Sequence, residues 1–271
     1  MTHDLLQQLR VEPGSAPRLD KRDPDVRIGA KNKHEGLELL RAQVERLSAL
    51  QTRLAAEATR AVLVILQGMD ASGKDGTIRH VFTGVNPQGC RVVSFDVPTP
   101  TELAHDYLWR VQVQCPARGE IAIFNRSHYE DVVAVRVRGL VPKQVWKRRY
   151  EHIRGFERML VDEGTTVLKL FLDVSRDEQG QRLQERLDNP EKRWKFRVGD
   201  LDDRRLWDEY MTAYEDAIHQ TSTDWAPWYV VPADHNWVRN LAVGEILVDA
   251  LERLDPQLPK PDPGLDGVEV S

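Results

Sequence analysis

The sequence predicts an α/β fold in which a central parallel sheet lies between two layers of helices. Apolar, β-branched runs alternate with segments of helical periodicity along the chain, which is typical of a parallel sheet covered on both faces. A glycine-rich loop stands between the first of these runs and a helical segment. The chain has 271 residues, which is enough for one large domain or for a domain with a lid.

The expected elements follow in chain order from these local patterns. Residues 1–34 are polar and carry several prolines, so we expect an extended arm that lies on the core or on a partner. A helix at 35–57 should follow, with a leucine stripe that packs on the sheet. Strands are predicted at 61–66, 91–97, 120–124, 166–174 and 225–231. Helices are predicted at 77–82, about 99–115, 142–163, 175–187, 202–220 and from about 237 to 254. This gives an arm and helix at 1–57, a core at 58–255 and a loose, proline-rich tail at 256–271.

Composition indicates a soluble globular enzyme, with 41% hydrophobic and 30% charged residues. The formal net charge of −5 argues against a general nucleic-acid binder. The longest apolar run is too short to span a membrane, and the N-terminus lacks a signal-peptide core, so we expect a cytoplasmic protein with no membrane partner. Cys90 and Cys115 lack metal-ligand spacing and are expected to be reduced thiols.

Residues 68–74 read GMDASGK, which has the spacing of a phosphate-binding loop between a strand and a helix. Gly68 and Gly73 let the backbone wrap, so that its N–H groups face a phosphate chain, and Lys74 supplies a positive charge. The alternative is an ordinary glycine turn. The remaining loop positions of the candidate site are Met69, Ala71, Ser72 and Gly76.

Acidic residues make this loop unusual. Asp75 stands where the motif commonly has a Ser or Thr hydroxyl that binds Mg²⁺, and Asp70 lies inside the loop. Carboxylates beside phosphates are unfavourable unless a cation intervenes, so we interpret Asp70 as a metal ligand. Asp75 is open to a second interpretation, in which it complements the dipole of the following helix.

A second polar segment, FNRSHYED at 124–131, ends the third predicted strand. Ligands of open α/β sheets bind at the carboxyl ends of the strands, so this segment should face the phosphate loop. Asp131, with Glu130 as the alternative, is the candidate acidic group for Mg²⁺, and Arg126 is a candidate phosphate contact. Capping or surface solvation is the alternative for each residue.

The region at about 176–205 is rich in cations and poor in apolar residues, so it predicts a lid that becomes ordered when its cations meet phosphate. The alternative is that these charges lie on solvated helix faces. The candidate lid residues for the site are Arg182, Arg186, Lys192 and Lys195.

These motifs together resemble the type 2 polyphosphate kinases over nearly the whole chain after residue 30. The matching segments are GMDASGKDG at 68–76, FNRSHYED at 124–131, DNPEKRWK at 188–195 and VPADHNWVRN at 231–240. The Asp-Gly after Lys74 is that family's own form of the loop. The resemblance implies a P-loop kinase-like, three-layer α/β/α sandwich with a helical lid and an N-terminal helical extension. It also implies Mg²⁺, with Mn²⁺ as a substitute, and assembly as a homo-dimer or tetramer.

By the same resemblance, Asp70 and Asp131 position the metal ions and Lys74 binds phosphate. Arg126 and the lid cations bind the polyphosphate chain or the transferring group. Asn125, in the FNRSHYED form of the motif, is similar to class III members, which phosphorylate both AMP and ADP.

The predicted reaction is reversible, Mg²⁺-dependent transfer of the terminal phosphoryl group of inorganic polyphosphate to AMP and ADP. Adenine nucleotides are the expected partners, with guanine nucleotides as further candidates. One alternative is a conventional nucleoside monophosphate kinase that uses ATP as donor. Another is a non-catalytic protein that binds polyphosphate or nucleotide.

Overall fold

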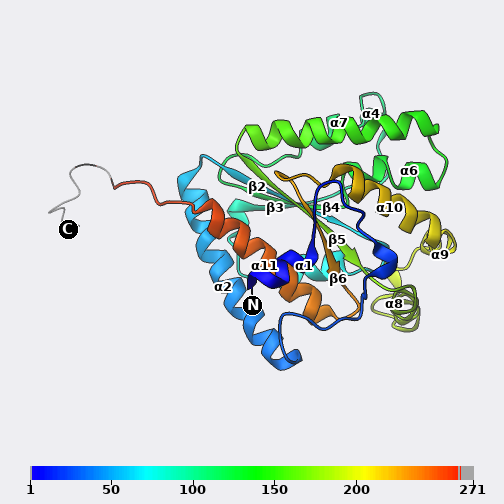
Figure 1. Ribbon diagram of the computed structural model, residues 1–271, viewed down its shortest axis with the longest axis horizontal. Helices are drawn as coiled ribbons and strands as arrows, with labels where there is room; N and C mark the ends of the chain where they lie inside the picture. The colour runs from blue at the N-terminus through cyan, green and yellow to red at the C-terminus, as the bar shows by residue number, and fades with distance from the viewer. Residues whose placement is uncertain (1, 262, 264–271) are drawn as a thin grey trace.

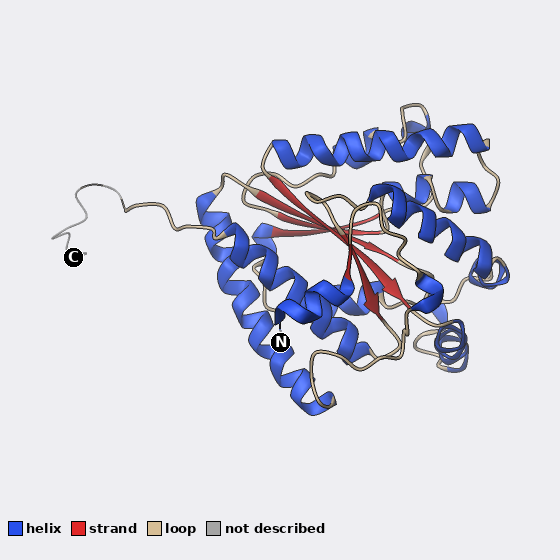
Figure 2. Cartoon of the chain, viewed as in Figure 1, coloured by secondary structure: helices blue, strands red, loops and turns tan. Residues whose placement is uncertain are grey.

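The structure, a computed structural model, describes residues 2–261 and 263. Helices cover both sides of a central sheet, which confirms the predicted three-layer α/β class (Figures 1 and 2). The sheet has six strands in the order β1-β6-β5-β2-β4-β3. Their bounds are Arg10–Val11, Ala61–Gln67, Cys90–Ser94, Ile121–Asn125, Thr165–Asp173 and Trp228–Pro232 for β1 to β6.

The helices divide between the two faces of the sheet. Helices α1 (Thr2–Leu9), α2 (Lys33–Glu57), α3 (Lys74–Val81) and α11 (Asn236–Leu254) lie on one face, and α6 (Ala134–Val137), α7 (Lys143–Asp162) and α10 (Trp207–Thr221) lie on the other (Figure 1). The remaining helices are α4 (Pro100–Leu103), α5 (Trp109–Gln112), α8 (Arg176–Asp188) and α9 (Gly199–Arg205). No helix in the described part of the chain is long and apolar enough to cross a membrane.

The central strand β2 sets the position of the phosphate loop. All of its residues are buried, and it pairs in parallel with β4 on one side and β5 on the other. In that register Leu66 lies opposite both Asn125 and Leu170. The loop that follows β2 therefore lies beside the segment that follows β4.

The prediction of an extended N-terminal arm was wrong in its first residues. Leu5, Leu6 and Leu9 have helical spacing, and they are buried on α1 in the core. Strand β1 then pairs antiparallel with β6, so the sheet is not wholly parallel. A two-residue strand carries no periodicity of its own, and its partner lies at the opposite end of the chain.

Three predicted helices also differ from the structure. Helix α2 has the expected range but packs chiefly along α11 rather than on the sheet, and Leu37 of its stripe is exposed. The helix predicted at 99–115 is two short helices, and the one at 202–220 is divided at Leu206 into α9 and α10. The predicted tail has neither helix nor strand at 256–261, and residues 262 and 264–271 lie outside the described residues.

Candidate active site

The segment between β2 and α3 forms the predicted loop. Gly68 and Gly73 have φ values of 143° and 102°, a region that side-chain-bearing residues rarely adopt. A Cβ on Gly68 would lie 2.7 Å from the backbone oxygen of Leu172, so the close packing of the loop on β5 also requires glycine. Lys74 is buried, and its Nζ donates hydrogen bonds to the carbonyls of Gly68 (2.7 Å) and Met69 (3.2 Å).

Arg126 joins the loop to the segment after β4. Its Nη2 donates to Asp70 Oδ1 at 2.6 Å, and its backbone N–H donates to the carbonyl of Leu66 at 3.0 Å. Burial acts to raise the pKa of Asp70, but Arg126 and Lys74 outweigh it and the pKa is lowered. Asp70 is therefore an anion in the loop, as a metal ligand must be.

Glu130 is the second carboxyl beside the loop. Burial raises its pKa, and the charges that act on it are those of Arg126, Lys74 and Asp70. With the Gln67 amide turned to donate, its nitrogen lies 3.0 Å from Glu130 Oε1. Glu130, the alternative acidic residue, therefore shares the electrostatic neighbourhood of the phosphate loop.

Asp131 lies among different charges. Arg149 Nη1 is 3.3 Å from its Oδ1, and Arg110 Nη2 is 3.8 Å from its Oδ2. Burial raises the pKa of Asp131 against the effect of these two arginines. The role of Asp131 as a metal ligand stays a prediction. Its carboxylate is paired with an arginine, as that of Asp70 is, and its buried Oδ2 has no hydrogen-bond partner in the described part of the chain.

The structure also brings Asp75 and Asn125 together. Asn125 Nδ2 donates to Asp75 Oδ1 at 2.8 Å, which links the first turn of α3 to the end of β4. This contact gives Asp75 a partner besides the helix dipole, and it places Asn125 at the border of the loop.

The lid candidates divide into two groups. Arg182 holds the loop itself, because its guanidinium donates to the carbonyls of Ala71 (3.0 Å) and Ser72 (3.3 Å) and to those of Ala233 (2.7 Å) and Asp234 (2.8 Å). Its Nε donates to Glu178 Oε1 at 2.8 Å, so Arg182 bridges the loop and α8, and its predicted contact with phosphate stays a prediction.

The side chain of Arg186 is more exposed than that of Arg182. It lies 3.7 Å from Asp200, and its charge helps to lower the pKa of Asp70 after those of Arg126 and Lys74. Lys192 and Lys195 are exposed, the first paired with Glu185 at 2.6 Å and the second beside the ring of Trp194. Neither lysine touches the phosphate loop. Their predicted contact with phosphate therefore requires the lid segment to move toward the loop.

Sequence reasoning missed two residues that support the loop. Arg239 is buried on α11, and its Nη1 donates to Ser72 O (3.3 Å) and to Asn236 Oδ1 (2.7 Å). Gln179 Nε2 donates to the carbonyl of Asp70 at 3.1 Å. Arg239 belongs to VPADHNWVRN, one of the segments that carry the family resemblance. The sequence of that segment does not show where the Arg239 side chain points.

The donor set fits a hard divalent cation. Mg²⁺ in phosphoryl-transfer sites uses one or two carboxylates and completes its shell with substrate phosphate and water. Asp70 provides a carboxylate in the loop, and Glu130 provides a carboxyl group beside it whose raised pKa a bound cation would lower again. Within residues 2–261 and 263 no cluster of three or more His, Cys, Asp or Glu has the arrangement of a metal cage. Two carboxyl groups without a complete metal cage agree with a cation whose remaining ligands come from substrate phosphate and water.

A strand, phosphate loop and helix on a largely parallel sheet, bordered by paired acidic and basic groups, define a phosphate-binding α/β protein. The family model of Polyphosphate kinase 2 (PPK2) matches residues 30–259, so the chain belongs to that family.

Individual relatives agree with this membership. The chain is 59% identical over 266 residues to "AMP/ADP-polyphosphate phosphotransferase" of Meiothermus ruber, covering 98% of this chain and 100% of that one. It is 46% identical to "ADP-polyphosphate phosphotransferase" of Rhodopseudomonas palustris, covering 95% and 93%. The crystal structure of Polyphosphate Kinase 2 from Arthrobacter aurescens TC1 superposes with a TM-score of 0.93 at 43% identity, covering 97% and 94% of the two chains.

Proposed function

We propose that this protein transfers the terminal phosphoryl group of inorganic polyphosphate to AMP and to ADP. The observation that carries the proposal is the convergence of Lys74, Asp70, Arg126 and Glu130 on one phosphate loop. Membership of the PPK2 family and the printed name of the Meiothermus ruber relative support polyphosphate as the donor and AMP and ADP as acceptors.

In the proposed reaction an anionic phosphate oxygen of the acceptor forms the new P–O bond. The bridging P–O bond of polyphosphate breaks, and its electron pair stays on the shortened chain. The acceptor oxygen is already charged near neutral pH, so no strong general base is needed. The obstacle is the repulsion between two polyanions, which fixed positive charges reduce.

The chain's own residues meet this obstacle by position and charge. Lys74 would contact the phosphates from within the loop. Arg126, directly after β4, contacts the loop at Asp70 and would add a second positive charge. Arg186 adds charge from α8. Asp70 and Glu130 would hold Mg²⁺, or Mn²⁺ in its place, and the ion would neutralise phosphate charge. We assign Asp131 to holding Arg110 and Arg149, the two cations it contacts.

A lid at 176–205 is part of the proposal. The segment between α8 and α9 is exposed, with Trp194 and Val198 at 77% and 74% exposure. An exposed segment with several cations has little to hold it in one place until phosphate is bound. Homo-oligomeric assembly and a cytoplasmic location complete the proposal, and multi-angle light scattering tests the first.

The experiment is a reaction of AMP with long-chain polyphosphate and Mg²⁺ in the absence of ATP. We expect ADP first and ATP after it, separated by anion-exchange chromatography. ATP formed only when ADP is supplied would restrict the acceptor to ADP. If neither acceptor reacts with polyphosphate but AMP is phosphorylated by ATP, the protein is a conventional nucleoside monophosphate kinase.

A further inference from the structure

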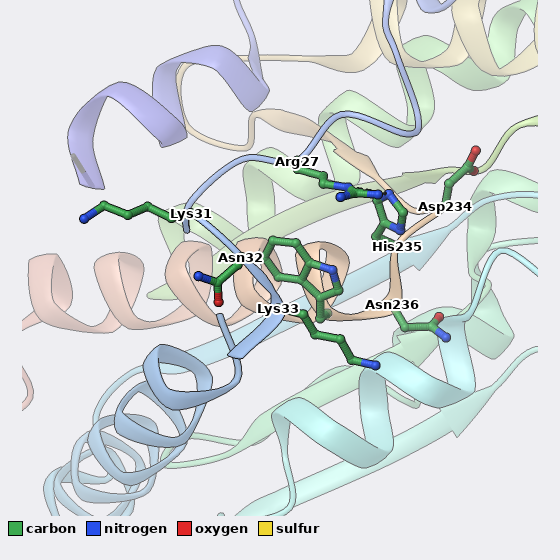
Figure 3. A pocket seen from close by; sticks show the side chains of 8 residues that line it. Arg27, Lys31, Asn32, Lys33, Asp234, His235 and Asn236 are labelled. Carbon is green, nitrogen blue, oxygen red and sulfur yellow. Dashed lines mark hydrogen bonds between the residues drawn. The ribbon is translucent and has the colours of Figure 1, made fainter. Parts of the chain in front are cut away.

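A cavity of about 440 Å³ lies between the N-terminal segment and the start of α11 (Figure 3). We call it the arm pocket. It shares no lining residue with the group proposed above for phosphoryl transfer. Its lining is formed by Arg27, Lys31, Asn32, Lys33, Asp234, His235, Asn236 and Trp237.

Positive charge predominates in this lining. Arg27, Lys31 and Lys33 are exposed, and within the described residues none of them is ion-paired with a carboxylate. Arg27 Nε donates to His235 Nε2 at 3.1 Å, and the two side chains point toward each other, whereas Lys31 points away from them (Figure 3).

Two of the acidic groups nearby already have partners. The carboxylate of Asp234 accepts from the backbone N–H of Ser175 at 2.7 Å. Asp25 Oδ1 lies 2.8 Å from His235 Nε2, the nitrogen that accepts from Arg27. Glu35 accepts from the backbone N–H of Lys31. Arg27 and Lys33 are therefore the side chains of the pocket most able to bind an added anion.

The start of α11 adds to this preference. Its first turn contains no acidic residue, and its N-cap residue, His235, makes no side-chain capping hydrogen bond. The N-terminus of a helix carries partial positive charge and free N–H donors, which favour an anion. This end of the helix belongs to the pocket, because Asn236 and Trp237 line it.

The arm pocket lies close to the phosphate loop. The guanidinium of Arg239 donates both to Ser72 O in the loop and to Asn236 Oδ1 in the pocket. The guanidinium of Arg182 likewise bridges Ala71 O and Asp234 O. One side chain therefore separates the two places in each case, so a long anion bound at the loop would have the pocket beside it.

We propose that the arm pocket binds phosphates of a long polyphosphate chain beyond those held by the phosphate loop. The proposal rests on the function proposed above and adds a second contact region for the donor. Cations and backbone N–H groups suit a bare phosphate chain. Trp237 as a residue is only 8% exposed, which leaves little aromatic surface for stacking a nucleotide base.

The test compares two double variants that remove the same charge. Arg27→Gln with Lys33→Gln changes the pocket, and Arg41→Gln with Arg53→Gln changes exposed arginines elsewhere on α2 as the matched control. With long-chain polyphosphate we expect the pocket variant to raise KM for the donor about tenfold with kcat unchanged. KM for tripolyphosphate and for AMP should stay as in the unaltered chain. The control variant should change none of these values.

A direct measurement of polyphosphate binding tests the arm pocket without relying on enzyme turnover. Anisotropy of fluorescently labelled long-chain polyphosphate should show weaker binding to the pocket variant than to the control, with a smaller difference in added NaCl. Equal binding by the two variants, or an equal rise of KM for tripolyphosphate and the long chain, would overturn the arm pocket. Absence of transfer from polyphosphate in the unaltered chain would instead overturn the proposed function.

Discussion

Replacing Arg182 tests whether this side chain holds the phosphate loop in place. Its guanidinium donates to four backbone carbonyls, two in the loop and two after β6, at 2.7–3.3 Å. In Arg182→Lys the charge remains, but one ammonium cannot serve both sides at once. Hydrogen bonds from charged donors contribute about 1.5–3 kcal/mol each, so losing two of them costs about 3 kcal/mol or more.

The measurement is urea denaturation together with the thermal midpoint. A cost of about 3 kcal/mol should lower Tm by roughly 6–12 °C for a chain of this size. The matched control is Arg186→Lys, on the same helix. It should leave Tm within about 2 °C because Arg186 makes only a long contact, with Asp200 at 3.7 Å, among the residues that the structure describes. The control should slow turnover instead. Equal stability of the two variants would refute the assignment of Arg182 to the scaffold of the loop.

The remaining predictions concern charge at the site and in the core. Lys74→Ala should lower kcat about 100- to 1,000-fold with an unchanged circular dichroism spectrum, and near-normal turnover would contradict its role. Burial lowers the pKa of Lys74 from 10.5 to about 8, so the loop loses its positive charge as pH rises through that value. The ratio kcat/KM for polyphosphate should therefore fall above about pH 8, and a profile that stays level there would contradict this. Glu130→Gln should raise the Mg²⁺ concentration for half-maximal rate about tenfold and Asp131→Asn less than about twofold, and the reverse order would restore Asp131 as the ligand. Glu157→Gln removes the partner of the buried Lys169, 2.6 Å away, and should cost about 3–5 kcal/mol in urea denaturation, whereas an unchanged midpoint would show that the pair adds nothing.

Local patterns were sufficient to predict the strand, loop and helix around Lys74, because each element depends on residues adjacent in the chain. The parallel arrangement of β2 and β4 followed from strand–helix alternation, and it placed the segment after β4 beside the phosphate loop as expected. The pairing of Arg126 with Asp70 was not predicted. Pairing of β1 with β6 was not predictable in this way, since it joins residues at opposite ends of the chain.

The roles of neighbouring charged residues were beyond the reach of sequence. Arg182 and Arg186 are both cations on α8, and only the docking of that helix shows that the first holds the loop while the charge of the second helps to lower the pKa of Asp70. Glu130 and Asp131 are adjacent in a 3₁₀ turn, and their side chains meet different arginines. Such differences depend on tertiary packing rather than on local spacing.

The most direct measurement of the central claim uses polyphosphate labelled with ³²P, mixed with unlabelled AMP and Mg²⁺ and no ATP. If the protein transfers the terminal phosphoryl group, label should appear in the β-phosphate of ADP and afterwards in ATP, while the polyphosphate chain shortens. The same mixture with the Lys74→Ala variant should show almost none. Unlabelled AMP remaining as the only nucleotide, with the polyphosphate intact, would contradict the account.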